Sequence, residues 1–415
     1  MSVLRLALMI KVKFSRSCRF AAKNLAVSRD ACQSSSVTDK TARIAVVMPR
    51  LSRYGGAESF AWRFSAALAG RGYDVDFICS RCETEPPEGV RPVVLGRFGP
   101  FKWFKVLHFA LKADAARKRG GYDLSFGLGK SLGHDIIRVG GGPQRNFWNL
   151  SIKAWPPGPQ RFLKCLRRRL SPANRIIQWL ERKRLESDPL IICVSDLVKG
   201  WMCRSFPQLD PERIKVIYNK PDLERFSPAT HDERAELRRA AGVAPDEVLV
   251  STAGTNFALK GVRTLVRMMP LLPAHFRLKV AGGRNPEKYV KLAKELGVAD
   301  RVEFLGKVED MPSLYRASDI FVLPTFYDAC SNAVVEALAC GCRVISTTSN
   351  GSSIFLPDDM ILEDPGDEHG LAQKVLKAAG EPRTDGFRWP DDVECGMEPY
   401  MDVVEDMIRK KPRQT

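Results

Sequence analysis

Two patterns that would indicate a metal centre or a membrane anchor are missing from this sequence. Its 415 residues include only five histidines, and no two of them have the spacing of a ligand pair. Because metal centres need clustered ligands, no dedicated metal site is expected. No apolar run reaches the ~18 residues of a bilayer-spanning helix, so no such helix is predicted.

Cysteine is present without the regular spacing of a disulfide framework. The 11 cysteines are scattered, and several lie in apolar runs, where a reduced thiol behaves as a small hydrophobe. This pattern favours a reducing, cytoplasmic compartment. Cys79 and Cys82 have C-x-x-C spacing, but no second pair completes a zinc site, and we interpret the spacing as incidental.

Acidic residues are scarce in residues 1–40, which are rich in Arg, Lys and Ser. The longest apolar run there, LALMI, is too short for a signal-peptide core. We expect a basic, disordered extension. The alternative is an upstream start codon that lengthens the true protein.

The whole chain is basic, with a net charge of +17 and a pI near 9.5. Such a balance implies an anionic partner: a nucleotide, a phosphorylated glycan, a membrane surface or nucleic acid. The hydrophobic share of 44% and the charged share of 27% are typical of a globular enzyme. The length fits two domains better than one.

A regular alternation of strands and helices begins at residue 43. RIAVVMP predicts a buried strand, GGAESFAWRFSAALAGRG a loop and an amphipathic helix, and YDVDFICS the next strand. Gly55 and Gly56 let the backbone approach a ligand at a helix N-terminus, so we predict that they contact an anion. Asp74 and Asp76 imitate a metal-binding D-x-D motif, but they open a strand, and we interpret them as a solvated strand edge.

A second region of the same kind begins near residue 247. Strands are predicted at EVLVSTAG, RLKVAGG, RVEFLG and DIFVLP, with helices between them. This alternation predicts an α/β protein with two doubly wound, Rossmann-like domains that face each other across a cleft. We place the domains at residues 41–225 and 226–380, followed by a tail at 381–415 whose helix packs back toward the first domain.

Two carboxylates and a lysine are expected at the carboxyl ends of strands in the second domain. Asp328 follows a strand, Glu336 lies in the first turns of the next helix, and Lys260 lies in a loop after a sister strand. The amides of Asn332 and Ala333 at that helix N-terminus form a site for a diphosphate, to which Lys260 adds a fixed positive charge. Glu336 is placed to bind a ribose, and Asp328 to point the other way, toward the group attached to the diphosphate.

These motifs resemble the retaining glycosyltransferases of family 4, which have the two-Rossmann-domain B fold, and among them the glucosyltransferases of lipopolysaccharide core assembly. The resemblance covers roughly residues 43–376 and is carried by GGAES, FGLGKSLGHDIIRVGGG, RIKVIYNKPDLERFSP, GTNFALKG and FLGKVEDMPSLYRASDIFVLPTFYDACSNAVVEALACG. It implies an N-terminal acceptor-binding domain and a C-terminal domain that binds a nucleotide sugar.

The resemblance also implies a reaction and the residues that serve it. The reaction is transfer of a hexose, from UDP-glucose or a similar UDP-hexose, to lipopolysaccharide core or a related cell-surface glycan, with retention and without a metal or cofactor. The implied catalytic residues are Asp135, Lys260 and Asp328. The implied donor contacts are Gly55, Gly56, Thr255, Lys260, Asp328, Ser331, Asn332, Ala333 and Glu336.

Three departures from the family pattern bear on the donor sugar. Asp328 stands where the family usually has Glu, Ser331 replaces a usual glycine, and Thr255 replaces a frequent arginine. The alternatives are a sugar-nucleotide epimerase of the same fold and a non-catalytic scaffold that binds a nucleotide sugar. A nucleic-acid-binding protein would suit the charge, but it would not need this set of strand-end residues, and no nucleic acid is expected as a partner.

Residues 144–187 interrupt the alternation as a basic helical insertion. From Arg145 to Glu186 the chain holds 11 Lys or Arg, all of them at 145–184, against two acids. Trp148, Trp155 and Trp179 accompany an apolar stripe opposite Arg167–Arg169, formed by Phe162, Leu163, Leu166 and Leu170. We expect this segment to bind an anionic surface, either the cytoplasmic face of the inner membrane beside a lipid-linked glycan acceptor or phosphorylated lipopolysaccharide core. The alternative is a solvated helical pair that caps the first domain.

Overall fold

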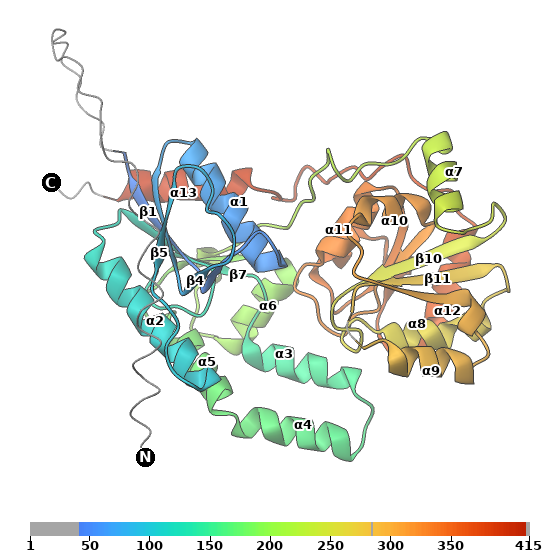
Figure 1. Cartoon of the computed structure of the whole chain (residues 1–415). Coiled ribbons are helices and arrows are strands. Elements are labelled where there is room, and N and C mark those ends of the chain that lie inside the picture. Colours follow the sequence, from blue (N-terminus) through green and yellow to red (C-terminus); the bar gives the residue numbers. More distant parts are fainter. Residues whose placement is uncertain (1–40, 284, 412–415) are drawn as a thin grey trace, which may run out of the picture. The chain divides into compact units, whose positions relative to one another are not determined.

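The computed structural model describes residues 41–283 and 285–411. The basic extension predicted for residues 1–40 lies outside these residues. The described chain forms two large parallel sheets with helices packed on them, and this confirms the predicted α/β fold of two Rossmann-like domains (Figure 1). No helix in this part of the chain is long and apolar enough to cross a bilayer.

The first sheet has seven strands within the described residues, and all of its strand pairs are parallel. Their order is β5 (Val90–Val94), β3 (Asp74–Cys79), β1 (Arg43–Val47), β6 (Leu124–Gly127), β7 (Ile136–Val139), β8 (Leu190–Cys193) and β9 (Ile214–Val216). Most of these segments are unbroken apolar runs, as expected for strands covered on both faces. The helices α1 (Gly56–Gly70) and α2 (Lys102–Arg119) connect strands of this sheet, and β2 (Arg50–Leu51) pairs with β4 (Arg81–Cys82) beside it.

The second sheet is also parallel, with six strands in the described chain. Their order is β12 (Val302–Gly306), β11 (Phe276–Ala281), β10 (Val248–Ala253), β13 (Ile320–Val322), β14 (Arg343–Thr347) and β15 (Ile361–Leu362). Its helices are α8 (Val262–Met268), α9 (Glu287–Glu295), α10 (Met311–Ala317), α11 (Asn332–Ala339) and α12 (Glu368–Ala379).

Each sheet has a point at which the order of its strands reverses. The first strand of each sheet lies in its interior: β1 between β3 and β6, and β10 between β11 and β13. At such a switch point the connections leave the strands on opposite faces, and a crevice opens beyond the carboxyl ends of the two strands. Ligands of doubly wound sheets bind in this crevice, so both switch points are places to look for a site.

The two domains share buried apolar surface. Trp201 of α6 (Asp196–Ser205), in the first domain, stacks on Tyr327 of the second with ring centroids 4.9 Å apart. The last helix, α13 (Glu398–Lys410), packs into the core of the first sheet, where Tyr400 is buried against Phe60 of α1. The chain therefore returns to the first domain after completing the second.

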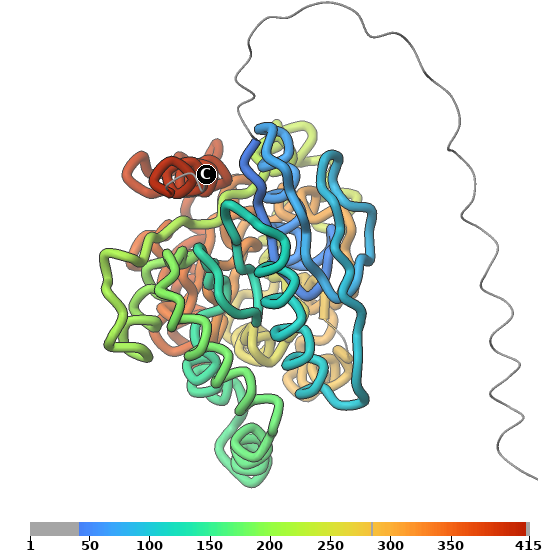
Figure 2. The backbone as a smooth tube through the Cα atoms, turned by 90° about the vertical axis from the view of Figure 1, so that its left-hand side faces the viewer, coloured from blue at the N-terminus to red at the C-terminus, as the bar shows by residue number. Residues whose placement is uncertain are grey.

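Residues 144–187 form mainly three helices: α3 (Gln144–Ser151), α4 (Pro159–Leu170) and α5 (Pro172–Lys183). Helix α5 packs against α2, whereas α4 has no buried residue. Helix α4 lies at the lower edge in Figures 1 and 2. Arg168 fastens it to α3, because its guanidinium donates to the Trp148 carbonyl and to Ser151 Oγ, both at 3.0 Å.

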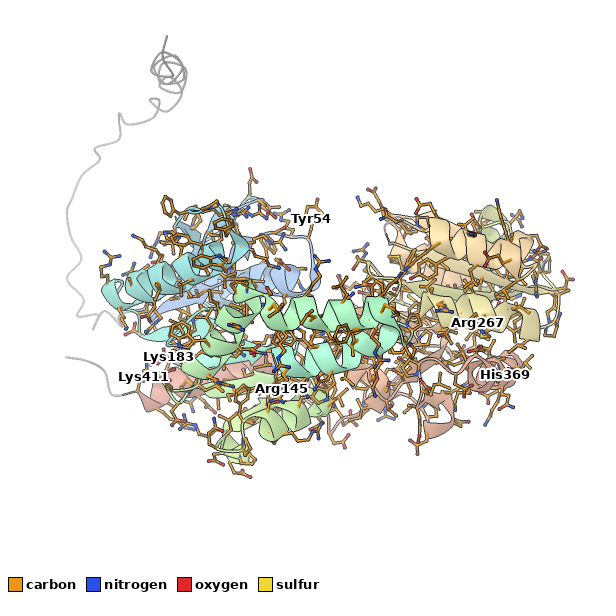
Figure 3. The ribbon with its side chains drawn as sticks, turned by 90° about the horizontal axis from the view of Figure 1, so that it is seen from below. Tyr54, Arg145, Lys183, Arg267, His369 and Lys411 are labelled. Atoms are coloured by element: carbon orange, nitrogen blue, oxygen red, sulfur yellow. The ribbon has the colours of Figure 1, made fainter. Side chains whose placement is uncertain are left out.

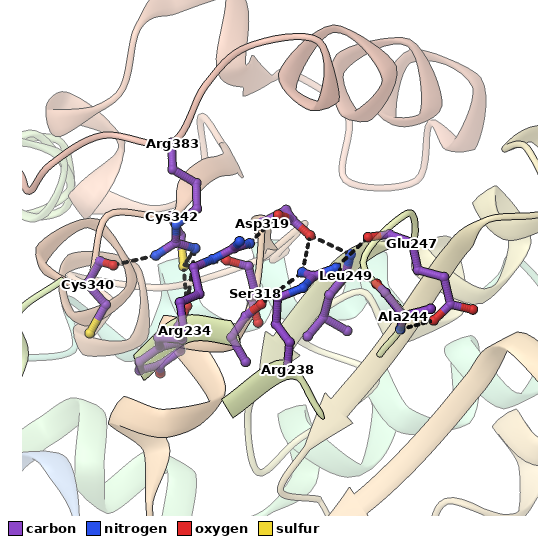
Figure 4. Close-up of polar contacts among 12 residues, drawn as sticks. Arg234, Arg238, Ala244, Glu247, Leu249, Ser318, Asp319, Cys340, Cys342 and Arg383 are labelled. Carbon is purple, nitrogen blue, oxygen red and sulfur yellow. Dashed lines mark hydrogen bonds and ion pairs between the residues drawn. The ribbon is translucent and has the colours of Figure 1, made fainter. Parts of the chain in front are cut away.

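An ion-pair network closes the amino ends of the second sheet (Figure 4). Asp319, just before β13, pairs with Arg234 and Arg238 of α7 (His231–Ala240) and accepts a hydrogen bond from the Leu249 amide at 2.8 Å. The charges at this edge are satisfied by one another. The candidate site lies at the opposite edge.

Candidate functional site

Lys260 and Asp328 meet at the switch point of the second sheet. Lys260 follows β10 and Asp328 follows β13, and these strands are neighbours. The two side chains are largely buried and form an ion pair. The carboxylate therefore points toward the lysine.

Helix α11 presents its N-terminus beside this ion pair. Ser331 is the N-cap residue, and its amide donates to the side-chain oxygen of Asn350 at 3.3 Å. Asn350 is buried, accepts a second hydrogen bond from the Ser352 amide and donates to Ser346 Oγ, so it holds the start of α11 rigidly. The first amides of a helix carry a partial positive charge, which favours an anion at this position.

Glu336 lies on α11, one turn inside this N-terminus. The buried Tyr315 hydroxyl donates to Glu336 Oε2 at 3.2 Å and fixes the position of the carboxylate. Burial raises the pKa of Glu336, and the Tyr315 hydrogen bond opposes that rise. The result is a carboxylate held in place with its second oxygen available to a ligand.

The first domain contributes a second helix N-terminus. Gly55 has a φ of 96°, which side-chain-bearing residues rarely adopt, and it directs Gly56 into the first turn of α1. A Cβ on Gly56 would lie 4.0 Å from Asn332 Nδ2, so the starts of α1 and α11 are close to each other. Two helix N-termini from different domains therefore converge on one place.

These groups line a single cavity of about 730 Å³ between the two domains. Eight of the nine predicted donor contacts lie in its wall: Gly56, Thr255, Lys260, Asp328, Ser331, Asn332, Ala333 and Glu336. The ninth, Gly55, sets the turn before α1 and is not in the wall. The charged lining is mostly basic, because Arg63, Arg138, Lys220 and Arg225 join Lys260 there.

Asp135, predicted as a catalytic residue, is not in this cavity. It directly precedes β7 and therefore lies at the amino end of the first sheet, opposite to the strand ends that form the cleft. Its carboxylate accepts hydrogen bonds from the Ser125 amide and hydroxyl at 2.8 and 2.6 Å, and it pairs with Lys411 Nζ at 2.6 Å, beyond the end of α13 (Figure 3). Asp135 thus ties the C-terminal segment to the sheet.

The interpretation of Asp74 and Asp76 as a solvated strand edge is wrong for Asp76, whereas the Asp74 side chain is 35% exposed. Strand β3 lies inside the sheet, and Asp76 is buried in ion pairs with Arg43 at 2.8 Å and Arg91 at 2.9 Å. The Tyr122 hydroxyl donates to the same carboxylate. Among the described residues no group of three His, Cys, Asp or Glu side chains is arranged to hold a metal ion.

Sequence reasoning missed a polar relay between the two domains. Arg138 of β7 is buried and donates to the Tyr400 hydroxyl at 2.9 Å and to Asn219 Oδ1 at 3.0 Å. Asn219 in turn donates to Asn332 Oδ1 at 2.8 Å, at the start of α11. The available signal was the single arginine within the apolar strand IIRV, since a buried charge needs a reason to be there.

Comparison with known proteins finds likenesses over part of this chain. Residues 246–380, which include Lys260, Asp328 and Glu336, match the family model described as Glycosyl transferases group 1. The chain is 34% identical over 181 residues to a D-inositol 3-phosphate glycosyltransferase of Mycobacterium sp. strain KMS, a match that covers 42% of this chain and 40% of that protein. A protein of the same description from Mycolicibacterium smegmatis is 29% identical over 248 residues, covering 55% of this chain and 56% of that one. The matches thus span about half the length of these relatives.

Solved structures extend the likeness to both domains. WaaG, a glycosyltransferase involved in lipopolysaccharide biosynthesis, superimposes with a TM-score of 0.68 at 20% identity, over 81% of this chain and 90% of that one. Sucrose-phosphate synthase from Thermosynechococcus elongatus gives 0.65 at 19% identity, over 82% and 90%. HepE of Anabaena, in complex with UDP-glucose, gives 0.58 at 17% identity, over 81% and 90%. At these identities the likeness shows the fold, which is that of the B-fold glycosyltransferases.

Proposed function

We propose that this protein is a retaining glycosyltransferase that moves a hexose from a UDP-hexose to a glycan acceptor. The observation that carries the proposal is the convergence of Lys260, Asp328, Glu336 and the N-terminus of α11 on one interdomain cavity. A nucleotide sugar presents a diphosphate, a ribose and a hexose in series, and these groups are complementary to the cavity's cation, helix dipoles and two carboxylates.

In the proposed reaction, the bond from the anomeric carbon to the diphosphate oxygen breaks. A bond from the acceptor hydroxyl oxygen forms on the same face of the sugar, and the hydroxyl proton passes to the departing diphosphate. Lys260 and the amides at the starts of α1 and α11 stabilise the negative charge that grows on the diphosphate, because they are already fixed around it. Glu336 binds the ribose hydroxyls.

The ion pair between Lys260 and Asp328 gives the two residues linked roles. A diphosphate competes with the carboxylate for the lysine, so donor binding releases Asp328 to accept hydrogen bonds from the hexose hydroxyls. The same cationic lining supports a reaction without a metal, since the leaving group is neutralised by side chains and amides of this chain.

The likeness to proteins of known structure supports the donor and the acceptor that we propose. The complex of HepE with UDP-glucose supports UDP-glucose or a similar UDP-hexose. The WaaG likeness supports lipopolysaccharide core or a related cell-surface glycan as the acceptor.

We further propose that the protein binds peripherally to the cytoplasmic face of the inner membrane through α4. Phe162, Leu163 and Leu170 are 70%, 55% and 59% exposed, and the same helix carries Arg161, Arg167 and Arg169. An exposed apolar stripe flanked by arginines fits the headgroup region of an anionic bilayer.

A donor screen tests the proposed activity. The protein is incubated with a panel of nucleotide sugars, without acceptor, and released nucleotide is measured by mass spectrometry. We expect slow release of UDP from one or a few UDP-hexoses, and no change with EDTA. Loss of release with EDTA and recovery with magnesium would contradict the metal-independent mechanism. UDP binding without release from any donor, even after acceptor glycans are added, would support the non-catalytic scaffold instead.

A further inference from the structure

Arg138 is a buried cation that no carboxylate of the described chain neutralises. The residue is only 7% exposed. Its guanidinium donates to two neutral groups, the Tyr400 hydroxyl and Asn219 Oδ1, and lies 3.9 Å from the centre of the Phe60 ring. A charge withdrawn from water without a partner of opposite sign is costly, so this arginine indicates an anion that the protein binds.

The contacts of Arg138 connect the N-termini of α1 and α11. Phe60, over whose ring it lies, is near the start of α1. Asn219, which accepts its hydrogen bond, donates to Asn332, the first residue of α11. Because helix N-termini carry a partial positive charge, they favour carboxylates and disfavour cations. An arginine here adds to an unfavourable concentration of positive charge, which an anion bound at the two helix starts would relieve.

One nitrogen of Arg138 remains for a ligand. Nη1 makes no hydrogen bond with any described residue and lies beside Gly140, where an added Cβ would be only 2.8 Å away. Gly140 has no positive φ, so the glycine serves the space that the guanidinium needs rather than the backbone conformation. Arg138 and Gly140 both line the interdomain cavity, so Nη1 is placed at its wall.

Arg138 differs from the other cations that line this cavity. Lys260 already forms an ion pair within the second domain. Arg63 and Arg225 are exposed, and Lys220 is partly exposed. Exposed charges are screened by water and salt, whereas a buried charge acts more strongly on a bound group. Arg138 is therefore a fixed charge for which no carboxylate competes.

We propose that Arg138 binds the diphosphate of the nucleotide-sugar donor, so that the first domain contributes a fixed charge to the leaving group. Nη1 would donate to a phosphate oxygen at the starts of α1 and α11, while Nε and Nη2 keep their bonds to Tyr400 and Asn219. The arginine and Lys260 would together stabilise the negative charge that grows on the diphosphate as the bond to the sugar breaks. The inference rests on the proposed glycosyltransferase function and adds a donor-binding residue outside the matched segment 246–380.

Binding of UDP and of uridine, which lacks the phosphates, tests the inference. Calorimetry gives the affinity for UDP, and ligand-observed NMR gives the affinity for uridine. We expect Arg138→Gln to weaken UDP by about tenfold or more, as for loss of a charged hydrogen bond, and to leave uridine unchanged. Arg138→Lys, which keeps the charge, should weaken UDP less. Tyr400→Phe is the matched control, because it removes one hydrogen bond of the arginine and keeps its charge, and it should retain the preference for UDP.

Gly140→Ala tests the same contact without removing the arginine, because the added Cβ must displace Nη1. It should also weaken UDP more than uridine, and it decides the question if Arg138→Gln binds neither ligand. Two results would overturn the inference: an unchanged ratio of UDP to uridine affinity in the Arg138 and Gly140 variants, or an equal loss of that ratio in Tyr400→Phe. Either result in a wild-type protein that binds UDP defeats this inference alone, whereas failure of the wild-type protein to bind UDP defeats the proposed function.

Discussion

Glu336 and Asp328 carry the same charge but differ in what surrounds them. Glu336 is fixed by the Tyr315 hydroxyl, whereas Asp328 is paired with Lys260. A substitution at Glu336 removes a carboxylate that is already positioned to accept hydrogen bonds from a ligand. A substitution at Asp328 removes a carboxylate and also leaves Lys260 without its ion-pair partner. The two positions should therefore respond differently to the nucleotide and to the sugar.

We predict that Glu336→Ala weakens UDP binding and that Asp328→Ala leaves it unchanged or tighter. Loss of a charged hydrogen bond costs about 1.5 to 3 kcal/mol, so the Glu336 variant should bind UDP roughly ten- to 150-fold more weakly. The Asp328 variant should instead lose use of the sugar donor. Calorimetry with UDP measures the first effect, with Glu309→Ala as an exposed control outside the cavity. Equal losses of UDP affinity in both variants would refute the assignment.

Lys260→Ala should lower kcat more than it raises KM for the donor. The lysine's charge matters most as the diphosphate departs, and removal of one such stabilising group typically lowers kcat by about 10²- to 10³-fold. Steady-state kinetics with the donor found in the screen gives both constants. Lys291→Ala, on an exposed side of α9, is the control. A rise in KM at constant kcat would show that Lys260 only binds the donor.

At the scale of elements, α4 is unusual because its apolar residues face outward. Arg168 reaches α3, and Lys164 lies over the Trp155 ring. Arg168 should be left intact in any test, since it holds α4 to α3. We predict that Arg167→Gln with Arg169→Gln lowers binding to vesicles containing anionic lipid by about tenfold or more, because each basic residue near such a surface contributes about 1 kcal/mol. Co-sedimentation with liposomes measures this, and binding should also weaken with salt.

The matched control is Lys291→Gln with Lys294→Gln on α9, which removes the same charge from another exposed helix. Liposome binding that does not depend on lipid charge, or that falls equally in both double variants, would show that α4 has only a structural role.

Elements were predictable from the sequence wherever one local pattern decided their form. Apolar strand runs followed by amphipathic helices predicted the parallel sheets, and the strand ends predicted that Lys260 and Asp328 would be brought together. Asp135 shows the limit of this reasoning. Its motif lies in the predicted cleft region, but the residue stands before its strand rather than after it, and the two ends of a parallel strand face opposite edges of the sheet.

Contacts that depend on the whole molecule could not be predicted from local patterns. Arg138 and Tyr400 are 262 positions apart, and Asn219 and Asn332 are 113 apart. Each pair meets only because the chain returns to the first domain through α13, or because the domains pack against each other. No periodicity or motif encodes such a meeting, so the relay from β7 to α11 became visible only in the folded chain.

This interlocking predicts that the two domains unfold together. One apolar cluster contains Trp201 of the first domain and Tyr327 of the second, and α13 joins the core of the first sheet after the chain has formed the second. Opening either domain alone would expose part of this shared surface, which is the cost that makes unfolding cooperative. Scanning calorimetry should therefore show a single transition, and UDP should raise its midpoint as a whole, because a ligand stabilises every part that unfolds with its site.

Trp201→Ala, which removes the stacked pair, should lower the free energy of unfolding by about 3 to 5 kcal/mol and broaden or split the transition. Arg204→Ala, on the same helix but without a partner in that cluster, is the control. Two wild-type transitions, of which UDP raises only one, would show that the domains are thermodynamically independent.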